Sequence, residues 1–108
     1  MKLSVVIPTR GDQNIKNITA CLRRQTFVDF ETIFIIDKLL TSAECRMQSA
    51  ECRNFRYINE SDALHNASKL RNLGIKAAKG EFILLMDDDE LFDDDYLERN
   101  VELREKYR

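Results

Sequence analysis

The densest group of residues able to do chemistry is an acidic cluster in the last quarter of the chain. Seven carboxylates and no basic residue lie in this stretch: Asp87, Asp88, Asp89, Glu90, Asp93, Asp94 and Asp95. Like charges at this density repel one another unless a cation or solvent screens them. Mg²⁺ and Mn²⁺ take hard oxygen ligands, usually one or two carboxylates completed by phosphate oxygens and water. The cluster is therefore a candidate metal site, and a solvated acidic loop is the alternative.

Four short apolar runs alternate with segments whose apolar residues recur at helical spacing. The runs predict β-strands over Lys2–Pro8, Thr32–Ile36, Phe55–Ile58 and Glu81–Met86, and Pro8 is expected to end the first. The predicted helices are one of about ten residues around Ile15, Ile18 and Leu22, then Thr41–Arg53, Ala67–Ala78 and Asp93–Arg108. The order βαβαβαβα predicts an α/β fold, a three-layer sandwich with a mainly parallel sheet between helices. We expect residues 1–108 to form one such domain, because no linker interrupts the pattern.

Polar side chains follow three of the four predicted strands. Thr9 comes after the first strand, Asp37 after the second, and Asp87–Asp89 after the fourth. Arg71 lies on the helix predicted between the third and fourth strands. In an open α/β sheet the ligand crevice lies at the carboxyl ends of the strands, so these groups are expected to meet there. The combination suits a ligand with a polar base, a ribose and a metal-bridged diphosphate. A helix cap at Asp37 and a surface ion pair at Arg71 are the alternatives.

Four segments, in order along nearly the whole chain, carry a family resemblance. They are Ser4–Thr9, Gln25–Glu31 with the strand that runs on to Asp37, Asn66–Ile75, and Lys79–Asp89. In this order they resemble the opening strand, the base-binding aspartate, the "ARN-x-G" helix and the D-x-D strand of family-two nucleotide-sugar glycosyltransferases. The resemblance implies the GT-A fold and a donor site for a nucleoside-diphosphate sugar, with a UDP-sugar expected. It also implies inverting transfer of the sugar to an acceptor that the motifs do not identify.

The resemblance implies a function for three residues outside the acidic cluster. Thr9 would line the nucleotide pocket, and Asp37 would accept a hydrogen bond from the base. Arg71 would contact the base or the diphosphate. Residues next to two of these positions differ from the family's pattern, namely Arg10-Gly11 and Lys38-Leu39-Leu40.

Within the cluster, the resemblance implies that Asp87 contacts the ribose and that Asp89, with Asp87, binds the divalent metal, Mg²⁺ or Mn²⁺. Asp88 is expected at the nucleotide-sugar site with no specific function. A metal at this place acts as a Lewis acid, because it stabilises charge on the departing nucleoside diphosphate. Family members carry the acceptor site and the catalytic carboxylate after this motif, whereas this chain stops one predicted helix after Asp89. We therefore expect the acceptor half to be absent and the catalytic residue to be unknown. The sheet edge left exposed predicts a homo-oligomer.

Composition excludes several other classes of protein. Charged residues make up 33% and apolar residues 44% of the chain, which is typical of a globular domain. The net charge is −2, and the few aromatic residues are not interleaved with basic ones, so no nucleic-acid partner is expected. No apolar run approaches the roughly 20 residues of a membrane span, and the N-terminus has no signal-peptide layout. A cytoplasmic protein is therefore expected. The alternative function is a non-catalytic module that keeps the fold for nucleotide binding or protein contacts.

Overall fold

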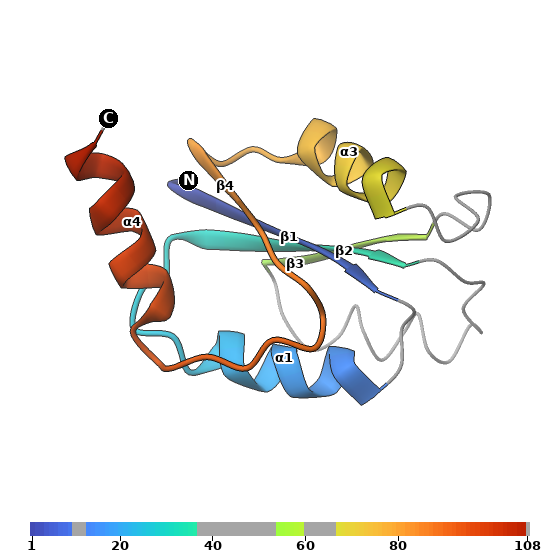
Figure 1. The fold of residues 1–108 in the computed structure, drawn as a ribbon, viewed down its shortest axis with the longest axis horizontal. Coiled ribbons are helices and arrows are strands. Elements are labelled where there is room, and N and C mark those ends of the chain that lie inside the picture. Colours follow the sequence, from blue (N-terminus) through green and yellow to red (C-terminus); the bar gives the residue numbers. More distant parts are fainter. Residues whose placement is uncertain (10–12, 37–53, 60–66, 108) are drawn as a thin grey trace.

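The computed structural model describes residues 1–9, 13–36, 54–59 and 67–107. Along these residues, seven elements follow one another (Figure 1): β1 (Leu3–Thr9), α1 (Gln13–Arg23), β2 (Phe30–Ile36), β3 (Phe55–Asn59), α3 (Ala67–Ala77), β4 (Phe82–Leu85) and α4 (Tyr96–Lys106). The helix predicted over Thr41–Arg53 lies outside the described residues. No helix among those described is long and apolar enough to cross a membrane.

The described strands form one sheet in the order β3-β2-β1-β4, and all three neighbouring pairs are parallel. The central strand β1 places Val6 opposite Ile33 of β2 and opposite Leu85 of β4. Because the strands are parallel, their carboxyl ends meet at one edge of the sheet. The predicted mainly parallel α/β sheet is confirmed.

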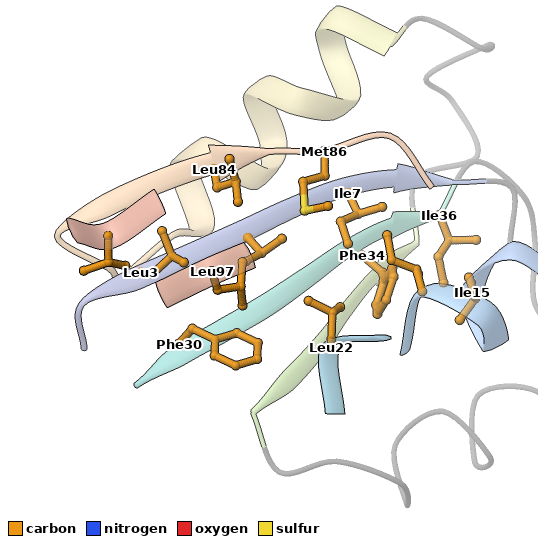
Figure 2. Packing of buried hydrophobic residues seen from close by; sticks show 13 residues of the cluster. Leu3, Ile7, Ile15, Leu22, Phe30, Phe34, Ile36, Leu84, Met86 and Leu97 are labelled. Atoms are coloured by element: carbon orange, nitrogen blue, oxygen red, sulfur yellow. The ribbon is translucent and has the colours of Figure 1, made fainter. Parts of the chain in front are cut away.

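Helices cover both faces of the sheet. Alternate residues of β1 point to opposite faces: Leu3, Val5 and Ile7 join a large apolar cluster with residues of α1 and α4, and Val6 joins a smaller one with Leu70 of α3. Figure 2 shows the large cluster packed beneath the strands. The three-layer arrangement expected from the sequence is therefore present.

Helix α3 lies unusually close to β1 because Gly74 faces the strand. A Cβ built at this glycine would stand 2.2 Å from Cγ1 of Val6, a distance that real side chains do not adopt. Glycine is thus the residue that lets the helix axis approach the sheet. Arg71, one turn earlier on the same helix, is positioned by this contact.

Strand β1 continues one residue past Pro8, which was expected to end it. The carbonyl of Val6 faces β4, where it accepts a hydrogen bond from Met86 N–H at 3.0 Å. Residues two apart on a strand face the same side, so Pro8 also faces β4. The next pair on that side, Ile7 with Met86, would need a bond from an N–H at position 8, which proline lacks. The ladder between β1 and β4 therefore ends at Val6 and Leu85, whereas the pairing of β1 with β2 continues to Thr9.

The last helix begins at Tyr96 and not at Asp93 as predicted. The carbonyls of Asp93 and Asp94 accept hydrogen bonds from Gln25 and Thr26 at 2.8 Å each. These contacts come from the turn after α1, and Tyr96 N–H also bonds to the Asp93 carbonyl at 3.1 Å, so the residues before Tyr96 form a turn and not the first turn of the helix. The predicted strand over Glu81–Met86 is likewise shorter, because β4 covers Phe82–Leu85.

Candidate functional site

The predicted site residues of β1 and β4 lie together at the carboxyl edge of the sheet. Thr9 is the last residue of β1, and the acidic segment begins directly after β4 on the neighbouring strand. The bond from Met86 N–H to the Val6 carbonyl extends the pairing by one residue beyond β4. Asp87, Asp88 and Asp89 therefore leave the sheet beside the end of β1.

The middle aspartate of the acidic segment is held by Thr9. The hydroxyl of Thr9, a residue only 5% exposed, donates a hydrogen bond of 2.7 Å to Oδ2 of Asp88. Asp88 is half-buried, whereas Asp87 and Asp89 on either side are exposed. The sequence assigned no specific function to Asp88, and the structure shows that it anchors the segment to β1. The outer two carboxylates remain open to solvent and to a ligand.

Arg71 of α3 pairs with the first aspartate of the segment. Its Nη2 lies 3.3 Å from Oδ1 of Asp87, and both side chains are exposed. The predicted alternative of a surface ion pair therefore describes this contact, but the partner is itself a predicted site residue. An exposed ion pair contributes at most about 1 kcal/mol, so an anionic ligand can displace it at little cost. The pair keeps a guanidinium and a carboxylate together at the sheet edge.

Asp37, predicted to contact the base, lies outside the described residues. The residue before it, Ile36, pairs in register with Thr9. The structure thus brings together Thr9, Arg71 and the three aspartates. The contact that each of them is expected to make with a nucleotide stays a prediction.

A divalent metal fits the donor atoms at this edge, although they do not form a complete cage. Within the described ranges, no three His, Cys, Asp or Glu side chains converge on one point. Asp87 and Asp89 offer exposed carboxylate oxygens, the hard ligands that Mg²⁺ and Mn²⁺ prefer. Mg²⁺ in phosphate-transfer sites is commonly bound by one or two carboxylates and completed by substrate oxygens. Two carboxylates therefore suit a metal that arrives with its ligand.

Sequence reasoning missed Gln25 as a residue that acts on the acidic segment. In the sequence, the segment Gln25–Glu31 stands out only because it precedes the strand leading to Asp37. The side chain is buried and donates a hydrogen bond of 2.8 Å to the carbonyl of Asp93. No local pattern signals this contact, because its partners lie 68 positions apart.

A second buried polar group, Glu31 of β2, ties the amino end of the sheet together. Burial raises the pKa of its carboxyl, but hydrogen bonds from Ser4, the Lys79 N–H and Arg56, with the positive charge of Arg56, outweigh this effect. The net result is a pKa below the ordinary value of 4.5. The guanidinium of Arg56 donates to Oε1 at 3.0 and 2.6 Å, and also to the carbonyl of Ala77 at 2.6 Å. Glu31 therefore joins β1, β2 and β3 to the segment that follows α3.

A parallel sheet with acidic, basic and hydroxyl groups at its carboxyl edge defines an α/β domain with a candidate ligand site at that edge. The chain belongs to glycosyltransferase family 2, whose model, Glycosyl transferase family 2, matches residues 4–108. It is 36% identical over 90 residues to a chondroitin synthase of Escherichia coli. The matched region covers 81% of this chain and 13% of that protein. It is 30% identical over 113 residues to the amylovoran biosynthesis glycosyltransferase AmsB of Erwinia amylovora, covering 98% of this chain and 36% of AmsB.

Solved structures agree on the fold. The 1–349 fragment of S. aureus TarS superimposes with a TM-score of 0.82 at 23% identity, over 98% of this chain and 33% of that one. The same fragment in complex with UDP-GlcNAc superimposes with a TM-score of 0.78 at 24% identity, over 98% and 32% respectively. The predicted GT-A fold is thus confirmed. The chain spans about a third or less of the length of these relatives.

Proposed function

We propose that this chain binds a nucleoside-diphosphate sugar, a UDP-sugar in particular, as the donor-binding part of an inverting glycosyltransferase. The observation that carries the proposal is the set of Thr9, Arg71 and Asp87–Asp89 at one edge of a GT-A sheet. The TarS fragment that superimposes on this chain was solved with UDP and with UDP-GlcNAc, which supports a uridine nucleotide as the ligand.

Each charged group at the edge is proposed to contact a different part of the ligand. The diphosphate is anionic and is attracted to the guanidinium of Arg71, which currently pairs with Asp87. The ribose carries hydroxyl donors that a carboxylate such as Asp87 accepts. Thr9 contributes by holding Asp88, which fixes the direction in which the segment leaves β4. The base is assigned to the neighbourhood of Asp37.

Asp89, together with Asp87, would hold Mg²⁺ or Mn²⁺ against the diphosphate. A divalent ion there supplies Lewis-acid stabilisation of the charge that develops on the leaving nucleoside diphosphate. The remaining task of these residues is orientation: they keep the sugar–phosphate bond at the open end of the sheet. The acceptor and the base that deprotonates it are assigned to no described residue. The predicted homo-oligomer and cytoplasmic location stay predictions, and light scattering tests the first.

Calorimetric titration with UDP, GDP, CDP and dTDP, each with and without Mn²⁺, tests the proposal. We expect one nucleotide, UDP, to bind in a Mn²⁺-dependent way, and Asp89→Ala to abolish that dependence. The matched control is Asp95→Asn, which removes one charge from the same acidic cluster at the start of α4 and should bind as the wild type does. Absence of binding by any nucleotide to the folded chain would contradict the proposal.

A further inference from the structure

The side chain of Gln25, in the turn after α1, bonds to two segments at once. It is 6% exposed, and its Nε2 donates to the carbonyls of Cys21 at 3.3 Å and Asp93 at 2.8 Å. Its Oε1 accepts a hydrogen bond from Leu97 N–H at 2.9 Å. Both the donor and the acceptor side of the amide are therefore engaged: one contact is with α1, one with the segment between β4 and α4, and one with the first turn of α4.

The neighbouring residue Thr26 strengthens this attachment. Its N–H donates to the carbonyl of Asp94 at 2.8 Å, and its hydroxyl donates to Oε2 of Glu98 at 2.8 Å. We call these contacts of Gln25 and Thr26 with residues 93–98 the clamp. Gln25 and the Thr26 N–H bind backbone groups of this segment, whereas its aspartate side chains pair with Arg24 and Arg99.

The clamp also supplies a cap that α4 lacks locally. Asp95 stands at the N-cap of α4 but makes no side-chain cap hydrogen bond. The first N–H groups of a helix have no partner within it, and a side-chain oxygen normally accepts from the second or third. Here Gln25 accepts from Leu97, the second residue of α4. The turn after α1 therefore stabilises the point at which the acidic segment becomes helix, beside the segment's own bond from Tyr96 N–H to the Asp93 carbonyl at 3.1 Å.

The acidic segment is held at both ends as a result. Met86, only 3% exposed, is bonded to β1 at one end. At the other end Phe92 packs against the large apolar cluster and lies 5.0 Å from the ring of Tyr96, just before the clamp. Figure 1 shows this stretch passing from β4 across α1 to the start of α4. Exposed ion pairs from Arg24 and Arg99 to the side chains of residues 93–95 offset part of the repulsion among its carboxylates, and the clamp adds an attachment through the backbone.

We infer that Gln25 is a positioning residue for the metal-binding carboxylates Asp87 and Asp89. It acts through the Asp93 carbonyl and the Leu97 N–H, which determine where the acidic segment ends and hence the path that residues 87–91 take from β4. The inference rests on the proposed function, since it presupposes a metal-dependent nucleotide site. Groups that orient metal ligands commonly change metal affinity by about 10–100-fold when they are removed.

Two substitutions at Gln25 and one matched control test the inference. Gln25→Met keeps the length of the side chain but neither donates nor accepts. Gln25→Glu keeps an acceptor for Leu97 N–H and, when ionised, cannot donate to Asp93. The control is Ser4→Ala, which removes a buried hydroxyl that donates to Glu31 and accepts from Gly80 N–H on the sheet face opposite α1. Each variant is measured for Tm and for the Kd of UDP with Mn²⁺ and with EDTA.

We expect Gln25→Met to raise the Kd for UDP in Mn²⁺ about tenfold while leaving the Kd in EDTA unchanged. Gln25→Glu should weaken Mn²⁺-dependent binding as well, because an ionised carboxylate at this buried position faces the carbonyls of Cys21 and Asp93 and donates to neither. Ser4→Ala should lower the Tm without changing either Kd. A general loss of structure would not be confined to the metal-dependent measurement, so this pattern separates positioning from stability.

Other outcomes overturn one claim or the other. Wild-type Kd values in folded Gln25→Met, or equal weakening in Gln25→Met and Ser4→Ala, would overturn the positioning function and leave the proposed function intact. Failure of the folded wild-type chain to bind UDP with Mn²⁺ would overturn the proposed function and the inference with it. If Gln25→Met does not fold, Gln25→Glu and Thr26→Val at reduced temperature decide by the same comparison.

Discussion

Replacement of Arg56 by methionine is expected to lower the free energy of unfolding by about 2–3 kcal/mol. The carboxylate of Glu31 is 3% exposed and receives two hydrogen bonds from this guanidinium, at 3.0 and 2.6 Å. Removal of one partner from a buried ion pair costs about 3–5 kcal/mol, because the other charge is left buried. The side chain of Arg56 is 37% exposed, so in the variant water can reach the carboxylate and solvate it. The expected loss of stability is therefore about 2–3 kcal/mol, below that range.

Urea denaturation at pH 7 measures this loss, provided that the m-value is unchanged. The pH dependence gives an independent check. The pKa of Glu31 lies below 4.5 in the folded chain, so its stabilising contribution is complete above the pKa of the unfolded state and is lost as the pH falls through the folded one. The deficit of Arg56→Met should therefore shrink below pH 4.5, because a protonated Glu31 needs no cation.

The double variant Glu31→Gln with Arg56→Met should recover part of the loss at pH 7. In wild type, the Ser4 hydroxyl and the Lys79 N–H both donate to Oε2 of Glu31, and the amide oxygen of a glutamine at this position can still accept from both. Its amide nitrogen would take the place that faced the arginine. A loss below about 1 kcal/mol for Arg56→Met, the range of exposed ion pairs, would refute the reasoning. A deficit that does not change between pH 7 and pH 3 would refute it equally.

Three further substitutions probe the site and the packing. Thr9→Val should weaken Mn²⁺-dependent UDP binding severalfold in calorimetry, because Asp88 loses its anchor, whereas Thr9→Ser should bind normally; equal binding by both variants would contradict the anchoring function. Gly74→Ala should lower stability in urea by about 1–3 kcal/mol despite the higher helix propensity of alanine, and Val6→Ala should restore part of the loss. Phe34→Ala should cost about 3–5 kcal/mol in the same assay, because this fully buried ring packs against the aromatic residues of β3; a loss under about 1 kcal/mol would contradict that packing.

The strands, and the edge at which the described candidate residues meet, could be predicted from the sequence because both depend on short-range patterns. Runs such as Thr32–Ile36 are apolar on both faces, and a polar residue directly after a parallel strand must lie at the carboxyl edge. The contacts that shape the site could not be predicted in this way. Thr9 and Asp88 lie 79 positions apart, and nothing near either residue indicates that the middle aspartate is the one bonded to the strand. The start of α4 at Tyr96 could not be predicted for the same reason, since the carbonyls of Asp93 and Asp94 bond to Gln25 and Thr26 from a distant part of the chain.

The position of β4 next to β1 has a consequence for the order in which a growing chain acquires its structure. β1 pairs with β2 across a short stretch of sequence, but its other edge is completed only by residues 82–85. During synthesis on the ribosome, that edge is unpaired until most of the 108 residues have been made. Pairings of such separation form slowly, and an open strand edge is a surface for association with other chains. The hydroxyl of Thr9 also meets Asp88 only after β4 has been made, so the proposed nucleotide binding would report that β4 has paired with β1.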